Sequence, residues 1–166
     1  MLSVLPEKLK KLAAACPFSL YVVGGAVRDF YAGLKSKNRD IDICAPVSAE
    51  EFVEIAEKSG FCVDATYKNT GAVKLSADGQ DYEFTCFRTD EYVRGGHVPR
   101  NIKYTSDINL DARRRDFKCN AVYFDIKSGA IADPLGGMND IKRGILSTVA
   151  PADKVFGEDG LRLMRL

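Results

Sequence analysis

Two aspartates, Asp40 and Asp42, alternate with isoleucines in the segment RDIDICA (39–45). This alternation predicts a β-strand, in which side chains two residues apart point to the same face. Both carboxylates then face one spot, while Ile41 and Ile43 enter the core behind them. Paired carboxylates repel each other without a cation, and Mg²⁺ binds one or two carboxylates together with substrate phosphates. The pair indicates a metal–nucleotide site, although an isolated D-x-D is more often a solvent-facing strand edge.

A paired glycine, Gly24-Gly25, stands about fifteen residues before the aspartates. It lies where an apolar, strand-like segment (19–24) meets a segment with helical character (25–33). The first N–H groups of a helix lack intrahelical acceptors, and the helix dipole favours an anion there. A phosphate can approach such a backbone because no Cβ is in the way, although a paired glycine before a helix is most often only a turn.

Arg28 lies one turn into the helix that this glycine pair opens. Its guanidinium can bind a phosphate oxygen through charge-assisted hydrogen bonds, or it can pair with Asp29 or Asp40 as part of the structure. The combined arrangement of two glycines, a short helix and alternating aspartates is far more restrictive than any of its parts. It shifts the interpretation toward a phosphate and metal site.

The surrounding segments predict elements in the order β-α-β-α-β-β. Leucines at near-helical spacing in residues 1–16 predict an amphipathic packing helix. A serine cap, an acidic first turn and a terminal glycine predict a helix over 48–60. An Asp-Gly pair predicts a hairpin over 72–87. Charge, glycine and proline over 88–110 predict a long loop of the kind that is often functional or mobile.

The last third of the chain returns to regular patterns. Residues 117–126 have strand character, 138–144 predict a short helix, and GEDGLRLMRL (157–166) predicts the beginning of another helix. Segments of both kinds place the chain in the α/β class. These elements must bring the glycine pair and the aspartates to one place.

Composition limits the possible classes of protein. The 166 residues have room for one core, and the formal net charge of +1 gives no overall attraction to nucleic acid or membranes. No signal peptide or membrane span is present, so we expect a soluble, cytoplasmic protein without membrane partners. Five scattered cysteines indicate buried free thiols rather than zinc ligands or disulfides. They are Cys16, Cys44, Cys62, Cys86 and Cys119.

Four segments together resemble one family. GGAVRDFYAG (24–33) with RDIDI (39–43), DARRRDFKCNA (111–121), DPLGGMNDIKRG (133–144) and EDGLRLMRL (158–166) are similar, in order, to the motifs of the class II tRNA nucleotidyltransferases. These are the CCA-adding enzymes and their bacterial poly(A) polymerase relatives. The resemblance implies the nucleotidyltransferase fold of the DNA polymerase β superfamily, an α/β (α+β) fold whose mixed, mostly antiparallel sheet is flanked by helices.

The second motif implies recognition of the nucleotide sugar and phosphates by Arg114, Arg115 and Asp116, with Asp111 completing the motif. Guanidinium groups suit phosphate, and a carboxylate that accepts from a ribose hydroxyl favours ribonucleotides. Asn120 would serve the fold or the site geometry. Without the other motifs, a solvated basic run would be the better interpretation.

The fourth motif implies a protein template for the base, formed by Asp159 and Arg162. On a helix these residues are neighbours, and together they can read the exocyclic amine and ring acceptors of cytosine or adenine. A surface ion pair is the alternative. Glu158 is interpreted as an acid of the helix N-terminus. Gly157 and Gly160 depart from the family pattern and should loosen the helix start.

Three further features have weaker functional interpretations. The third motif (133–144) is interpreted as a turn and helix start. Glu83 can supply a third acidic group from a neighbouring strand, or it can face solvent. His97 stands where the family often has a basic residue and is interpreted as a loop residue.

The resemblance implies a Mg²⁺-dependent, template-independent RNA nucleotidyltransferase that adds C and A from CTP and ATP to the tRNA 3′ end. Asp40 and Asp42 would bind the metal in a two-metal mechanism. CC or A addition alone and poly(A) synthesis share these motifs. A nucleotide-binding module without turnover, and a structural or interaction domain, are the alternatives from other classes.

The resemblance also predicts the domain organisation. Residues 1–150 would form the nucleotidyltransferase head, and 151–166 the truncated start of a helical neck. Family members continue into regions that hold the tRNA, so this chain alone is expected to bind RNA weakly or not at all. The oligomeric state is not predicted.

Overall fold

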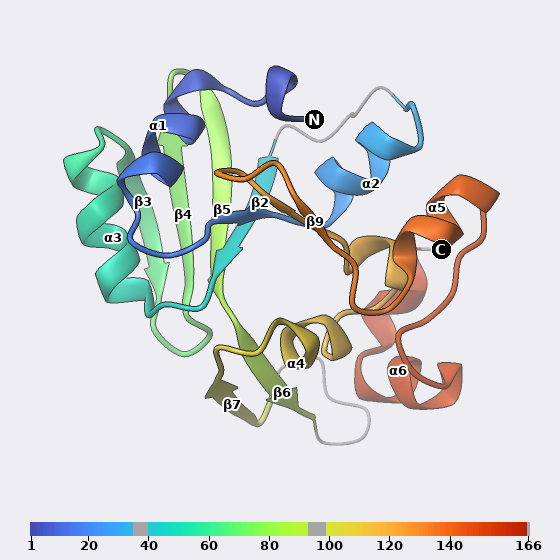
Figure 1. Ribbon diagram of the computed structural model, residues 1–166. Helices are drawn as coiled ribbons and strands as arrows, with labels where there is room; N and C mark the ends of the chain where they lie inside the picture. The colour runs from blue at the N-terminus through green and yellow to red at the C-terminus, as the bar shows by residue number, and fades with distance from the viewer. Residues whose placement is uncertain (35–39, 93–98, 166) are drawn as a thin grey trace.

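The computed structural model describes residues 1–34, 40–92 and 99–165 (Figure 1). The 3-10 helices are labelled η. In chain order the elements are η1 (Leu2–Val4), α1 (Glu7–Ala15), β1 (Tyr21–Val22), α2 (Gly25–Tyr31), β2 (Asp40–Ala45), α3 (Ala49–Lys58), β3 (Cys62–Tyr67), β4 (Ala72–Ala77), β5 (Gln80–Cys86), β6 (Arg88–Glu91), β7 (Asn101–Tyr104), α4 (Ile108–Arg113), η2 (Lys118–Asn120), β8 (Tyr123–Asp125), β9 (Ile131–Ala132), α5 (Gly137–Arg143), α6 (Ala152–Glu158) and η3 (Gly160–Arg165).

A seven-stranded sheet in the order β3-β4-β5-β2-β1-β8-β9 organises the chain. The central strands β2 and β5 pair in parallel, and the other neighbours pair antiparallel. The parallel register places Asp42 directly beside Glu83. The predicted α/β class with a mixed, mostly antiparallel sheet is confirmed.

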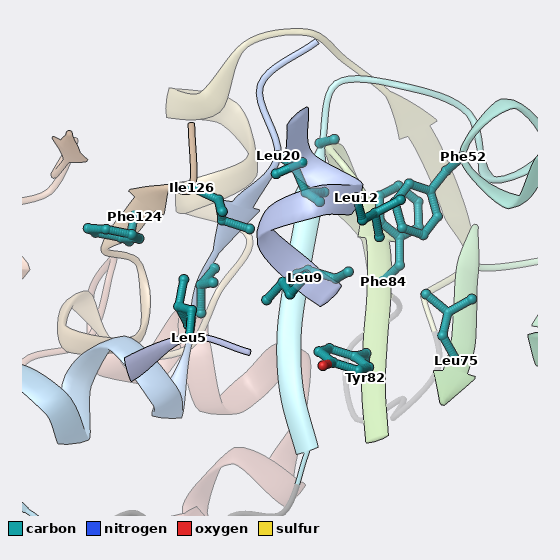
Figure 2. Packing of buried hydrophobic residues seen from close by; sticks show 14 of the residues in the cluster. Leu5, Leu9, Leu12, Leu20, Phe52, Leu75, Tyr82, Phe84, Phe124 and Ile126 are labelled. Atoms are coloured by element: carbon teal, nitrogen blue, oxygen red, sulfur yellow. The ribbon is translucent and has the colours of Figure 1, made fainter. Parts of the chain in front are cut away.

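One face of the sheet carries the main hydrophobic core beneath α1 and α3. Leu9 and Leu12 of α1 and Phe52 of α3 are fully buried with Phe84 of β5 (Figure 2). The rings of Phe52 and Phe84 stack with centroids 3.7 Å apart. Helix α3 begins where Ser48 accepts a hydrogen bond from the Glu51 N–H at 3.2 Å, which satisfies one of the free donors of the first turn. The opposite face of the sheet is thereby left for the site.

Strand alternation separates this core from the polar face. Ile43 is fully buried in the main core, whereas its neighbours Asp42 and Cys44 turn to the other side. There Cys44 packs in a second, smaller cluster with Tyr123 and Phe87. The prediction that carboxylate and aliphatic side chains of this strand point to opposite faces is confirmed.

The prediction of a loop over 88–110 is wrong for most of the residues that the structure describes there. Strands β6 and β7 pair antiparallel across it, and α4 begins before its end. This ribbon is polar, with Lys103 bound to Glu91 at 3.2 Å, so it shows none of the hydrophobic alternation by which strands are recognised. Residues 93–98, and with them the prediction for His97, lie outside the described residues.

Three other segments also differ from the prediction. Strand β3 was not predicted, because it lies at the sheet edge with mostly exposed residues and a register shift between Val63 and Ala65. Residues 117–126 hold a 3-10 turn before the short strand β8. The predicted helix over 157–166 is interrupted, because α6 ends at Glu158 and Asp159 takes an extended conformation before η3.

The third motif has the predicted structural role. Both carboxylate oxygens of Asp133 accept backbone hydrogen bonds at the start of α5, from Gly137 N–H at 2.7 Å and from Met138 N–H at 3.0 Å. A Cβ at Gly137 would lie 2.0 Å from the carbonyl oxygen of Lys118. Glycine is therefore required for α5 to pack closely on η2.

Replacing Phe52 by alanine should lower the free energy of unfolding by about 3–5 kcal/mol, because a buried ring is lost and a cavity remains. Urea denaturation measures this change. Leu161→Ala is the control, since that side chain is 54% exposed and its truncation should cost less than about 0.5 kcal/mol. Equal stability of the two variants would contradict the packing.

Candidate functional site

A pocket of about 490 Å³ opens on the polar face of the sheet. Segments that are far apart in the sequence meet there: the β1–α2 junction, β2, β5, β6, the segment after α4, and the α6–η3 end (Figure 1). The predicted site residues that line it are Gly24, Gly25, Arg28, Asp42, Glu83, Arg114, Arg115, Asp116, Asn120, Asp159 and Arg162. Asp40 and Asp111 were also predicted but do not line it.

The acidic wall of the pocket is formed by Asp42 and Glu83 on the parallel strands β2 and β5. Asp40 lies two residues earlier on β2 and is exposed at the strand start. Asp42 keeps an exposed surface, but the atoms packed around its carboxylate desolvate it and raise its pKa; Arg115 opposes this shift, and the charges of Glu83 and Asp40 add to it. The wall is therefore electrostatically unfavourable in the absence of a cation.

Gly24 lets the β1–α2 turn pass close to this wall. Its φ of +74° lies where side chains are rarely tolerated, and a Cβ there would lie 2.7 Å from Asp42 Oδ2. Any larger residue would push against the carboxylate. Glycine at position 24 is therefore what lets the turn approach Asp42 this closely.

The basic side of the pocket is held in place from below by Asp111, which is completely buried. Its Oδ1 accepts from Arg114 Nε at 2.7 Å, and its Oδ2 accepts from Arg115 Nη2 at 3.2 Å and from Tyr123 Oη at 2.7 Å. Burial alone would raise the pKa of Asp111, but Arg115 and Arg114 lower it to about 2. The carboxylate is ionised and orients both arginines.

Asp90 was missed by the sequence analysis, because it lies in the segment predicted as a loop. Its side chain is almost fully buried and binds Arg88 Nε at 2.9 Å. A second contact, of 3.7 Å, joins it to Arg114. Arg88 also donates to the carbonyl oxygen of Thr70. Asp90 thus connects strand β6 to Arg114, which lines the pocket.

Asp116, Asn120 and Arg28 form a hydrogen-bonded chain along another side. Asn120 Nδ2 donates to Asp116 Oδ1 at 3.1 Å, and Asn120 Oδ1 accepts from Arg28 Nη1 at 2.8 Å. Arg28 also pairs with Asp29 at 2.7 Å, so of its two predicted acidic partners the structure selects Asp29. Arg28 still lines the pocket, and the two interpretations of this residue are therefore compatible.

The α6–η3 end differs from the prediction of one regular helix that carries Asp159 and Arg162. Glu158 is the last residue of α6, not an acid at a helix start, and it binds Arg162 Nη1 at 3.2 Å. Arg162 also donates to the carbonyl oxygens of Val155 and Arg114, at 3.1 and 3.0 Å. These contacts fix the guanidinium of Arg162 at the pocket.

Two more pocket residues had no role in the sequence analysis. Tyr92 places its ring 5.3 Å from the guanidinium carbon of Arg162, and Arg165 binds Asp116 at 2.7 Å. Arg165 had a signal, because it stands three residues after Arg162 and therefore recurs on the same side of a helix. Tyr92 had none, because no periodic pattern surrounds it.

The described part of the chain was searched for metal-binding clusters and for membrane-spanning helices. No group of three or more His, Cys, Asp or Glu side chains within it could hold a metal ion. None of its helices has both the length and the apolar character that a membrane span requires.

Comparison with known proteins gives a consistent picture. Residues 20–147 match the family model of the poly A polymerase head domain. A CCA-adding enzyme of Geobacillus kaustophilus (strain HTA426) is 37% identical over 148 residues, which are 89% of this chain and 35% of that enzyme.

Solved structures agree in fold. The CCA-adding enzyme of Bacillus stearothermophilus in complex with CTP aligns with a TM-score of 0.75 and 33% identity over 95% of this chain and 36% of that one. A tRNA nucleotidyltransferase complexed with a primer tRNA and an incoming ATP analog aligns with a TM-score of 0.69 and 26% identity, over 95% of this chain and 42% of that one. This chain thus spans less than half the length of the proteins it matches.

Replacing Asp111 by asparagine should lower the free energy of unfolding by about 3–5 kcal/mol, because two buried guanidinium groups lose their counter-charge. Wild-type stability should also fall as pH drops from the ordinary value of 3.8 toward 2, since the folded-state pKa lies below the unfolded one. Urea denaturation at several pH values measures both effects.

The matched control is Asp64→Asn, at an exposed carboxylate on the edge strand β3. It should change the free energy of unfolding by less than about 0.5 kcal/mol. An Asp111→Asn variant as stable as this control would show that the buried network does not support the pocket.

Proposed function

Because the chain belongs to the poly A polymerase head-domain family, we propose that it is the nucleotide-binding and catalytic part of a template-independent RNA nucleotidyltransferase. The enzyme adds C and A from CTP and ATP to the 3′ end of tRNA. The observation that carries this proposal is the pocket itself, which brings the acidic pair Asp42 and Glu83 together with Arg114 and Arg115. A nucleoside triphosphate with a divalent cation complements both sides.

The donor set fits Mg²⁺. Asp40 and Asp42 offer hard carboxylate oxygens, and Mg²⁺ requires only one or two of these because substrate phosphates and water complete its coordination. Asp42 and its acidic neighbours would be relieved of their repulsion by a bound cation. When bound, divalent cations activate the attacking 3′-hydroxyl and neutralise the leaving pyrophosphate. Asp40 and Asp42 are the proposed ligands.

The chain's own side chains supply position and charge. Gly24 and Gly25 leave the backbone of the β1–α2 turn open to the triphosphate, and Arg114 and Arg115 face its negative charge. Arg28 adds a third guanidinium from α2. In the transfer, the 3′-oxygen of the RNA bonds to the α-phosphorus and pyrophosphate leaves. Arginines already fixed by Asp111 need no reorganisation as charge moves to the leaving group.

Sugar and base are assigned to the remaining pocket residues. Asp116, oriented by Asn120, would accept a hydrogen bond from a ribose hydroxyl. Arg162 and Asp159 would read the base edge from the α6–η3 end, where Arg162 is held by Glu158. Because these contacts fix Arg162 before the nucleotide arrives, the template is preorganised rather than formed on binding.

The proposal also includes the domain division. Residues 1–150 form the head, and 151–166 begin a neck that would continue toward the tRNA-binding regions. The packing of Val155, which is almost completely buried, is compatible with a neck that starts in contact with the head. Recognition of the tRNA body is assigned to regions outside this chain.

Asp42→Asn should remove the Mg²⁺-dependent part of CTP binding, because the Asp42 carboxylate is the proposed metal ligand. Calorimetric titration with CTP, with and without Mg²⁺, measures this difference. Asp64→Asn on β3 removes the same charge at a position outside the pocket, and this variant should bind CTP as the wild type does. Undiminished Mg²⁺ dependence in Asp42→Asn would contradict the assignment, and Mg²⁺-independent binding by the wild type would favour a nucleotide-binding module without turnover.

A further inference from the structure

The two carboxylate oxygens of Asp116 accept hydrogen bonds from different kinds of donor. Oδ1 accepts from the Phe117 N–H at 2.7 Å and from Asn120 Nδ2 at 3.1 Å. Among the described residues, Oδ2 accepts one hydrogen bond, from Arg165 Nη1 at 2.7 Å. Oδ1 is held by a backbone donor and by a side chain that is itself fixed, so Oδ2 is the oxygen that can change partner.

The position of Arg165 follows from the conformation of η3. In a 3-10 helix the side chains at i and i+3 eclipse each other, so Arg162 and Arg165 both face the pocket. They are held to different degrees. Arg162 has a side chain only 5% exposed and three acceptors, whereas the Arg165 side chain is 63% exposed and its ion pair is with Asp116. Arg165 is therefore the less firmly held of the two arginines.

Asp116 is ionised, so its Oδ2 can accept a hydrogen bond from any donor that reaches it. Burial raises its pKa, but hydrogen bonds from Arg165, Asn120 and the Phe117 N–H together lower it below the ordinary value. The carboxylate is thus ionised at neutral pH. Its side chain is 5% exposed although it lines the pocket, with Arg165 on the oxygen that a ligand would use.

We propose that Arg165 and the ribose 2′-hydroxyl compete for Asp116 Oδ2, so that Arg165 sets how strongly the pocket selects ribonucleotides over deoxyribonucleotides. This inference rests on the proposed function, in which Asp116 receives the sugar. A ribonucleotide gains the hydroxyl–carboxylate bond only after it displaces Arg165. Its apparent affinity is therefore the intrinsic affinity multiplied by the fraction of sites in which the Arg165–Asp116 ion pair is open. A deoxyribonucleotide does not need Oδ2 and leaves Arg165 in place.

The test compares CTP with 2′-deoxy-CTP by calorimetric titration in Mg²⁺. In Arg165→Gln the CTP to dCTP affinity ratio should rise about fivefold, the size expected for one partly exposed ion pair. The ratio is the readout because the lost charge weakens both triphosphates alike. Arg165→Lys keeps the charge and should have a ratio near that of wild type.

A second control is Met164→Gln, which changes the neighbouring residue of η3 at a side chain 85% exposed and outside the pocket lining. It should leave the ratio unchanged. Binding of CTP by Arg165→Gln but not by the wild type would also support the competition.

Two outcomes would overturn the inference, and they are distinguishable. If wild type binds CTP with Mg²⁺ and Arg165→Gln leaves the ratio unchanged or lowers it, Arg165 does not oppose the sugar, while the proposed function stands. If neither protein binds CTP, the proposed function fails and the inference fails with it.

Discussion

The basic side of the pocket depends on the buried carboxylate of Asp111. Its oxygens join Arg114 and Arg115 to Tyr123 of β8, and Oδ1 also accepts from the Arg88 N–H of β6 at 3.2 Å. Elements from three parts of the chain meet at one ionised group. Two arginines packed side by side would repel each other, and burial would be costly without this counter-charge. The interaction therefore sets both the local fold and the direction in which positive charge faces the pocket.

A second constraint acts on the acidic wall. The parallel pairing of β2 and β5 requires Asp42 and Glu83 to lie side by side, and Gly24 approaches Asp42 closely. Asp90 and Asp116 pair with arginines in the same pocket, whereas the ion pairs between described residues do not include Asp42 or Glu83. A ligand that brings a cation to these two acids and phosphates to the arginines complements both charges. This complementarity is the physical basis for the proposed nucleotide chemistry.

The sequence was most informative where a pattern is local. Alternation in 39–45 predicted which side Asp42 faces, and the glycine pair predicted the turn between a strand and a helix, as the structure shows. The polar ribbon β6–β7 was not predicted because the side chains that β6 buries, Arg88 and Asp90, are charged, so hydrophobic periodicity carries no signal there. Asp111 was expected at the nucleotide but lies beneath the pocket, since spacing along a chain does not reveal depth.

Contacts between distant residues were beyond the reach of local patterns. Arg165 and Asp116 are 49 residues apart, and neither segment alone indicates the pair. The interruption at Asp159 had a local signal, because Gly157 and Gly160 flank it and weaken a helix. The consequence of that interruption, a 3-10 segment that points two arginines at the pocket, required the structure.

Calorimetric titration of the chain with CTP, ATP, GTP and UTP, each with and without Mg²⁺, shows whether the pocket binds a nucleoside triphosphate with the metal and reads its base. We expect Mg²⁺-dependent binding of CTP and ATP in preference to GTP and UTP; binding of ATP alone would favour A addition or poly(A) synthesis. Equal binding of all four nucleotides, or binding of none by the folded chain, would show that the pocket does not have the proposed role.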